Sequence, residues 1–194
     1  MALSSLCNKR GRNEGVGMGG HAPQPQGSSP SPWIVRFAPS VAAGGSVLDL
    51  ACGSGRHGRL FLERGHPVTF VDRDLSGVAD LRGDARAGLV EADLEVAPWP
   101  LGNRQFAAVI VTNYLWRPLF ADLLGSLLPQ GLLLYETFMR GNERFGKPAS
   151  PDFLLTENEL FERCKDSCEI LVFEQGEDGL PKPGMRQRIC ARKR

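Results

Sequence analysis

The sequence predicts an α/β fold with a doubly wound, mainly parallel sheet of seven strands that ends in an antiparallel hairpin. Short apolar segments alternate with helical segments from residue 46 onward, which is typical of a parallel sheet with helices on both faces. The last two apolar segments, 169–175 and 185–192, have only a Gly- and Pro-containing loop between them. These two strands are therefore expected to pair as antiparallel neighbours.

The length and composition allow one domain with a buried core. The chain has 194 residues, of which 42% are hydrophobic and 23% are charged, and these are ordinary values for a globular domain. Residues 1–30 are rich in Gly, Ser, Pro, Asn and Gln, a composition that predicts a disordered tail. The single domain is predicted at 31–194, and its first apolar residues, Trp33, Val35 and Phe37, are expected to pack on the body or to cover a pocket.

The strands are predicted from apolar, β-branched runs bounded by turn residues. The run FAAVIVTN at 106–113 is apolar on both faces, which is expected of a central strand in a parallel sheet. The run PVTFVD at 67–72 mixes β-branched and aromatic residues, which is typical of a buried strand. In chain order, the predicted strands are 46–50, 67–72, 87–93, 106–113, 132–138, 169–175 and 185–192.

The helices are predicted from the signals at their ends. Gly65 stops the first helix, and Asp74 caps the second. Pro118 suits the first turn of the third helix, which is followed by a turn at LPQG, residues 128–131. The pattern Thr-Glu-Asn-Glu at 156–159 starts the fourth helix as a capping box. The predicted helices are 55–64, 74–81, 118–128 and 156–165.

A glycine-rich turn follows the first predicted strand. Gly53, Gly55 and Gly58 have the spacing G-x-G-x-x-G, and glycines there let a ligand approach the backbone closely. This spacing occurs in dinucleotide-binding turns, but Asp49 stands just before it, and a carboxylate there would repel a pyrophosphate. The chain also has no Tyr-x-x-x-Lys pair of the short-chain dehydrogenase type. A small NAD(P)-binding oxidoreductase is therefore the less favoured alternative.

Three aspartates, Asp49, Asp72 and Asp93, end the first three predicted strands. The carboxyl ends of parallel strands meet at one edge of a sheet, so these carboxylates are expected along the same edge. A ligand with an ammonium group, a ribose diol and an exocyclic amine would use three such acceptors, and S-adenosylmethionine has all of them and no phosphate. Single aspartates at strand ends are often helix caps, but three in succession around a glycine turn favour a ligand site.

The same segments resemble the class I S-adenosylmethionine-dependent methyltransferases over about residues 33–192. VLDLACGSGRHGRLF is similar to the first motif of that family, and VTFVDRD is similar to its second-strand motif. The resemblance implies that Asp72 holds the ribose hydroxyls and that Asp93, in EADLE, lies near the adenine. It implies a Rossmann-like fold and S-adenosylmethionine as the cofactor. Within the family, the chain looks like small bacterial enzymes of the tellurite-resistance or small-molecule type.

The resemblance also implies two sets of site residues. Methyl transfer from a sulfonium is a one-step in-line displacement, which needs alignment and exclusion of water rather than a catalytic triad. The residues expected to hold the cofactor are Asp49, Ala51, Gly53, Gly55, Asp72, Arg73, Asp93, Leu94 and Asn113. The residues expected to face the transferred methyl group and to act in catalysis are Asn113, Tyr114 and Glu136, with Trp116 and Thr137 beside them.

Several of these side chains have a structural alternative. Glu136 acts as a base or orients an amine, or else it pairs with Arg117 or Arg140. Tyr114 and Trp116 form an aromatic wall beside the sulfonium, or else they pack in the core. The fourth-strand motif also lacks the two prolines of (Asn/Asp)-Pro-Pro-(Tyr/Phe), so N-methylation of DNA bases or glutamine of that kind is not expected.

Two further features lie close to this predicted site in the sequence. His57 sits one turn into the first helix and is expected at the helix surface. Residues 139–153 are long, polar and rich in glycine, and they are expected to form a lid over the acceptor. Arg140, Arg144 and Lys147 in that segment would suit an anionic acceptor, or else they are simply solvated.

Charge and cysteine usage bound the partners and the location. The net charge of +1 gives no general attraction to nucleic acid or membranes, so the acceptor is expected to be a small molecule. The basic end of the chain, residues 186–194, is the only local support for the alternative, an rRNA or tRNA methyltransferase. The five cysteines are an odd number, which predicts reduced thiols and no metal site. With no secretory signal or membrane span in view, the protein is expected in the cytoplasm.

Overall fold

The computed structural model describes residues 29–179 and 182–194. Of the tail predicted at 1–30, residues 1–28 lie outside the described residues. One seven-stranded sheet forms the body, in the order β3-β2-β1-β4-β5-β7-β6. The strands are β1 (Val47–Leu50), β2 (Val68–Asp72), β3 (Ala87–Glu91), β4 (Phe106–Thr112), β5 (Leu127–Phe138), β6 (Cys168–Asp178) and β7 (Gly184–Lys193).

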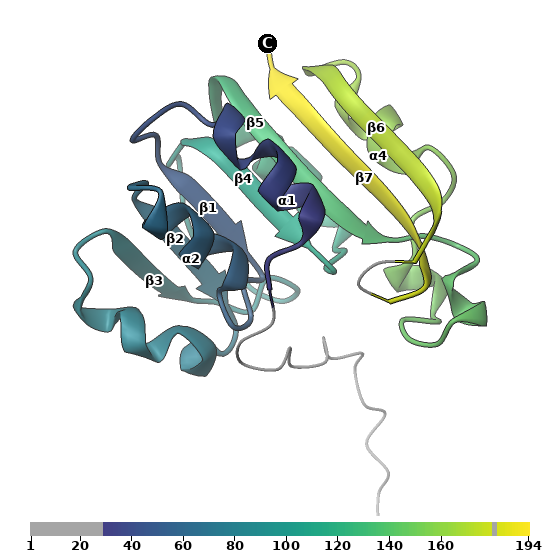
Figure 1. Cartoon of the computed structure of the whole chain (residues 1–194), viewed down its shortest axis with the longest axis horizontal. Coiled ribbons are helices and arrows are strands. Elements are labelled where there is room, and N and C mark those ends of the chain that lie inside the picture. Colours follow the sequence, from purple (N-terminus) through teal and green to yellow (C-terminus); the bar gives the residue numbers. More distant parts are fainter. Residues whose placement is uncertain (1–28, 180–181) are drawn as a thin grey trace, which may run out of the picture.

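The direction of the strands confirms the predicted topology. The neighbours from β3 to β5 pair in parallel, whereas β7 is antiparallel to both β5 and β6. Chain order reverses at β1, where β2 lies on one side and β4 on the other. A ligand-binding crevice is expected at the carboxyl ends of the strands beside such a reversal. Figure 1 shows these ends along one edge of the sheet.

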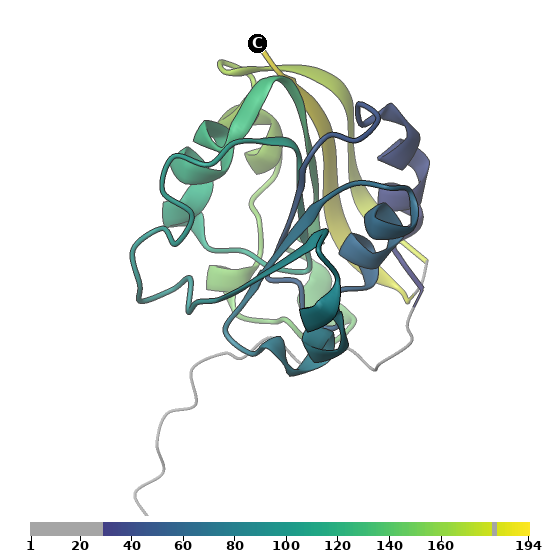
Figure 2. The same cartoon turned by 90° about the vertical axis from the view of Figure 1, so that its left-hand side faces the viewer.

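Helices cover both faces of the sheet (Figures 1 and 2). The α-helices are α1 (Pro32–Phe37), α2 (Arg56–Glu63), α3 (Phe120–Gly125) and α4 (Glu159–Cys164). Short 3-10 helices span Ala38–Ser40, Leu75–Gly83, Arg117–Leu119, Asn142–Arg144 and Pro151–Phe153. None of the helices in the described part of the chain is long and apolar enough to cross a membrane.

The alternation of side chains along β5 builds two separate cores. Leu134 points to the side of α1 and α2, where it shares a core with Trp33, Ile34 and Phe61. Tyr135 points to the other face, where the core includes residues of α3 and α4. The predicted packing of the first apolar segment is therefore correct for Trp33, which is buried, whereas Val35 is exposed.

Several predicted element boundaries are wrong. The helix predicted at 118–128 is a 3-10 turn followed by the short α3, because Leu127 already pairs with Phe106 in the sheet. The predicted turn 128–131 lies inside β5, as a bulge where the register with β4 shifts and Gln130 has a positive φ of 65°. The helix predicted from residue 156 begins at Glu159, whose carboxylate accepts the Thr156 N–H in half of the predicted capping box.

Candidate active site

The turn between β1 and α2 follows from its glycines. Gly53 and Gly55 have positive φ values of 54° and 68°, the left-handed region that favours glycine. A Cβ atom at Gly55 would lie 2.4 Å from a methyl group of Val78, and one at Gly58 would lie 2.2 Å from the ring of Phe70. The G-x-G-x-x-G spacing is therefore required both by backbone conformation and by the close packing of α2 against β2.

Two strand-end aspartates hold this turn. The Gly58 N–H donates to Asp49 Oδ2 at 2.8 Å, and the Gly53 N–H donates to Asp72 Oδ2 at 2.8 Å. Asp49 is only 1% exposed and lies beneath the turn rather than in the pocket described below. Burial raises the pKa of Asp49 to about 7, although the hydrogen bond from Gly58 opposes the shift.

An open pocket lies where β1, β2, β3 and β4 reach their carboxyl ends. Each of these strands, or the turn after it, contributes to the wall, as the switch-point rule requires. Residues predicted for the site that line it are Ala51, Asp72, Arg73, Asp93, Leu94 and Tyr114. Two lining residues, Ala92 and Glu95, were missed by the sequence reasoning, although both belong to the acidic segment EADLE that pointed to this turn.

Two buried hydroxyl groups have no hydrogen-bond partner among the described residues: Tyr114 Oη, on a residue that lines this pocket, and Ser54 Oγ, in the glycine turn. A buried hydroxyl without a partner costs about 1–3 kcal/mol, so such groups are expected where a ligand completes the bonding. Burial, with Glu95 and Asp93 nearby, raises the pKa of Tyr114, and its hydroxyl is therefore a protonated donor. The acidic wall and the unpaired donors fit a polar ligand such as S-adenosylmethionine.

The candidate residues at the ends of β4 and β5 lie in a second group, next to this pocket. Asn113 has a positive φ of 53°, and its Oδ1 accepts a hydrogen bond from Arg186 Nη1 at 3.0 Å. Glu136 is buried and stands opposite Arg188 in the β5–β7 register. Its Oε2 accepts the Arg188 Nε–H at 2.5 Å, and Arg188 also pairs with Asp178. The structural alternative for Glu136, an ion pair, is therefore correct in kind but wrong in its partner, which is Arg188 rather than Arg117 or Arg140.

His57 lies in this second group and corrects another prediction. It is 2% exposed instead of lying at the helix surface, because α2 packs its first turn between Ser31 and β4. Nε2 accepts the Ser31 N–H at 3.2 Å, so the proton is assigned to Nδ1, which donates to Thr112 Oγ1 at 3.2 Å. Burial lowers the pKa of His57 to about 3, so the ring is a neutral link between these three segments.

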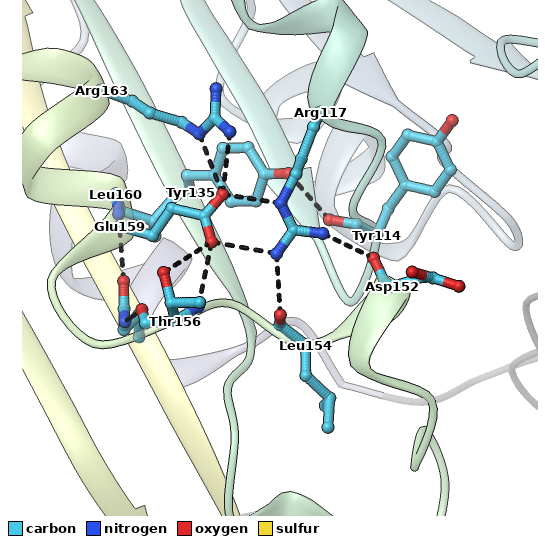
Figure 3. A network of polar contacts seen from close by, with 10 residues as sticks. Tyr114, Arg117, Tyr135, Asp152, Leu154, Thr156, Glu159, Leu160 and Arg163 are labelled. Atoms are coloured by element: carbon cyan, nitrogen blue, oxygen red, sulfur yellow. Dashed lines mark hydrogen bonds and ion pairs between the residues drawn. The ribbon is translucent and has the colours of Figure 1, made fainter.

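A third polar group anchors the segment that was predicted to be a lid (Figure 3). Arg117 donates to both carboxylate oxygens of Glu159, at 2.8 and 2.9 Å, and to the carbonyls of Asp152 and Leu154, each at 2.8 Å. Burial favours the neutral form of Glu159, but hydrogen bonds from Arg117, the Thr156 N–H and Arg163 outweigh it and lower the pKa to about 2. The end of the 139–153 segment is thus fixed beside β4.

Backbone hydrogen bonds join the two ends of that segment. The Arg140 N–H donates to the carbonyl of Leu155 at 2.9 Å, and the Leu155 N–H donates to that of Phe138 at 3.0 Å. Arg140, Arg144 and Lys147 are exposed. These three side chains are therefore solvated in this structure, which is the second of the two alternatives given for them.

The same network touches the pocket through Tyr114. Its backbone carbonyl accepts the hydroxyl of Tyr135 at 2.8 Å, whereas its own hydroxyl points away from the network (Figure 3). Tyr114 therefore has a fixed backbone and a side chain directed to the pocket wall. Trp116 is half-buried and packs against the core on this face, as its structural alternative proposed.

The chain was compared with families and with solved structures. A family described as a methyltransferase domain matches residues 47–131. No curated protein sequence matches the chain. TehB from Haemophilus influenzae has 21% identity and a TM-score of 0.68, over 83% of this chain and 61% of that one. The chain therefore spans less than two thirds of the length of that relative.

Two further structures have a similar fold. One is the Burkholderia thailandensis 1,6-didemethyltoxoflavin-N1-methyltransferase, crystallised with 1,6-didemethyltoxoflavin and S-adenosylhomocysteine. It has 21% identity and a TM-score of 0.63, over 84% of this chain and 76% of that one. A TehB-like S-adenosylmethionine-dependent methyltransferase from Corynebacterium glutamicum has 20% identity and a TM-score of 0.59, over 84% and 88%. Residues 47–131 thus match a methyltransferase-domain family, and the described part of the chain shares its fold with these three structures.

Proposed function

We propose that this chain transfers a methyl group from S-adenosylmethionine to a small-molecule acceptor. One observation carries the proposal: the pocket at the carboxyl ends of β1–β4 is lined by six of the residues that the motifs predicted. Among them are the acids that end β2 and follow β3, Asp72 and Asp93. Pyrophosphate would meet carboxylates at this wall, which weighs against a dinucleotide.

We assign proposed roles to the six predicted residues that line the pocket. One oxygen of Asp72 accepts the Gly53 N–H and the other accepts the Asp74 N–H. The remaining lone pairs of the carboxylate accept the ribose hydroxyls. Asp93 accepts the exocyclic amine of the adenine, and Tyr114 donates from its unpaired hydroxyl. Ala51, Arg73 and Leu94 close the walls around the base and the ribose.

The chemistry requires little more from the protein than alignment. When bound, S-adenosylmethionine supplies a methyl group on a positively charged sulfur, which takes up the electron pair of the carbon–sulfur bond as S-adenosylhomocysteine forms. Asn113 and the Gly53 turn are proposed to line the path of the acceptor, and Tyr114 is proposed to exclude water beside the sulfur. Glu136 would be a base only after release from Arg188, so we propose that it orients Arg188 instead.

Similar structures support a small acceptor. The Burkholderia relative was crystallised with 1,6-didemethyltoxoflavin, a small molecule. The arginines of the basic C-terminal end offer little free basic surface: Arg186 is buried, Arg188 is half-buried, and Arg192 and Arg194 contact Glu169 and backbone carbonyls. This leaves little unpaired basic surface on β7 for RNA.

The test is to follow the label from S-adenosyl-[methyl-³H]methionine into a cell extract divided into a fraction below about 3 kDa and an RNA fraction. We expect label in the small-molecule fraction with wild type and a loss of at least ten-fold with Asp72→Ala. Label in the RNA fraction, falling steeply as salt is raised, would support the RNA alternative instead.

The domain boundary and the location are part of the proposal. Ser31 caps α1 and bonds to His57, which supports a domain that starts at residue 31 and runs to 194. A cytoplasmic location remains a prediction from the sequence.

A further inference from the structure

Arg186 is a buried cation at the end of the sheet where the acceptor is expected. It lies on β7 opposite Phe138, the last residue of β5, and it is 6% exposed. Its guanidinium carbon lies 4.0 Å from the centroid of the Phe138 ring. On its other side it bonds to Asn113, which directly precedes the pocket residue Tyr114. Arg186 is therefore linked, through Asn113, to the end of β4 that also carries the pocket residue Tyr114.

Within the described residues, the hydrogen bonds of Arg186 leave its buried Nε–H without an acceptor. A guanidinium has five N–H groups. One of them, on Nη1, bonds to the neutral amide oxygen of Asn113 at 3.0 Å. Nε is buried and has no hydrogen-bond partner among the described residues, with Oδ2 of Asp178 at 3.9 Å. A buried guanidinium with so few partners is costly, unlike Arg188, which pairs with both Glu136 and Asp178.

The charges around Arg186 also leave room for an anion. Arg56 and Arg188 act on its charge unfavourably, whereas Glu136 and Asp178 act favourably. The described groups that act on the charge of Arg186 are thus two guanidinium groups and two carboxylates, and neither carboxylate accepts a hydrogen bond from its buried Nε–H. Burial lowers the pKa of Arg186, because burial disfavours the charged form of the guanidinium.

We propose that Arg186 binds a carboxylate group of the methyl acceptor, with Asn113 and Phe138 fixing the plane of its guanidinium. A carboxylate is planar and offers two oxygens, which match two adjacent N–H groups of a guanidinium. It would balance the charge of Arg186 and accept the Nε–H, which has no hydrogen-bond partner among the described residues. This inference rests on the proposed function, because it names the class of acceptor for the same site.

The test uses benzoate as the probe, with benzamide as its neutral counterpart, on the full-length protein saturated with S-adenosylhomocysteine. Saturation-transfer NMR reports binding, and titration gives the dissociation constant. We expect benzoate to bind and benzamide not to bind. Arg186→Gln should weaken benzoate at least ten-fold, Arg186→Lys should restore part of the affinity, and the affinity for S-adenosylhomocysteine should stay within two-fold. Arg192→Gln, at a half-buried arginine on the same strand that pairs with Glu169, is the matched control and should behave as wild type.

Three results would overturn the inference. They are no benzoate signal with wild type, equal affinity in Arg186→Gln, or displacement of benzoate by a lower concentration of inorganic phosphate. Wild type alone decides the first and third, so the test holds even if Arg186→Gln does not fold. Failure of S-adenosylhomocysteine to bind wild type would instead contradict the proposed function, and benzoate titrated without it would still report on Arg186.

Discussion

Asp49 and Asp72 end neighbouring strands, yet their surroundings give them different tasks. Asp72 lines the pocket and shares its oxygens between two backbone N–H groups and the open space. Asp49 is buried and bonds to Gly58 inside the turn. The same residue type thus serves the proposed ligand in one case and the shape of the glycine turn in the other.

Asp49 predicts a specific pH dependence. Its pKa in the folded protein is about 7, above the value near 4 expected in the unfolded chain, so the folded state holds the proton more tightly. Its contribution to stability is therefore present below about pH 4 and falls as pH rises toward 7. We expect Asp49→Asn to remove this fall. The free energy of unfolding of the variant should therefore rise relative to that of wild type as the pH increases from 4 to 7. Urea unfolding across that range measures it, and parallel curves for the two proteins would contradict the assignment.

Tyr114 predicts a trade between stability and binding. Its hydroxyl is buried without a partner in the free protein, so Tyr114→Phe should leave the free energy of unfolding unchanged or raise it by up to about 1 kcal/mol. The same change should weaken S-adenosylhomocysteine about five- to twenty-fold, because the proposed donor to the ligand is lost. Thermal unfolding and calorimetric titration of one preparation give both numbers. Tyr135→Phe, which removes a hydroxyl bonded within the protein, is the contrasting variant and should lose stability.

Site residues could be predicted from the sequence where the residues that define their role are close to them in the chain. The glycines and Asp72 were found because their spacing in the chain already describes a turn beside a strand end. His57, Glu136 and Arg186 could not be placed, because their partners come from distant segments, such as Ser31 for His57. Only the register between β5 and β7 makes Glu136 the partner of Arg188.

At the scale of elements, the Glu159 network joins α4 to the segment after β4. Glu159 has a folded pKa of about 2, below its unfolded value, so its contribution is present above about pH 4 and is lost as pH falls toward 2. We expect Glu159→Gln to lower the free energy of unfolding at pH 7 by about 2 kcal/mol, because Arg117 and Arg163 lose their counter-charge.

The measurement for Glu159→Gln is urea unfolding at pH 7 and pH 3, with Glu162→Gln as the control. In the described part of the chain, the ion-pair partner of Glu162 is the exposed Lys165, so its loss should change stability by less than about 0.5 kcal/mol. The difference between Glu159→Gln and wild type should shrink at pH 3. An equal difference at both pH values would contradict the role of the ion pairs.

The strands were easier to predict than the helices. Strand positions follow from apolar runs that a central parallel sheet must bury, as at β4. Helix lengths depend on the sheet beside them: α3 stops at Gly125 because the chain must enter β5 at Leu127. The bulge at Gln130 was read as a plain turn, since sequence does not show that the strand resumes pairing on both sides of it.

At the scale of the molecule, the topology brings the two halves of the proposed reaction together. The reversal of strand order at β1 places the donor pocket on β1–β4. Because β7 is antiparallel to β5, its first residues, including Arg186 and Arg188, lie beside the carboxyl end of β5. The first residues of a parallel strand would lie beside the amino end instead. Asn113 lies between the two groups and connects them through Arg186.

The central claim is that the pocket holds S-adenosylmethionine through Asp72, and its most direct test is calorimetric titration with S-adenosylhomocysteine and, separately, with NADPH. Wild type and Asp72→Ala are compared, with Asp74→Ala as the control, since Asp74 caps the next helical segment and is exposed. We predict micromolar binding of S-adenosylhomocysteine by wild type and Asp74→Ala, a loss of at least ten-fold in Asp72→Ala, and no binding of NADPH. Binding of NADPH, with none of S-adenosylhomocysteine, would contradict the account and assign the glycine turn to a dinucleotide.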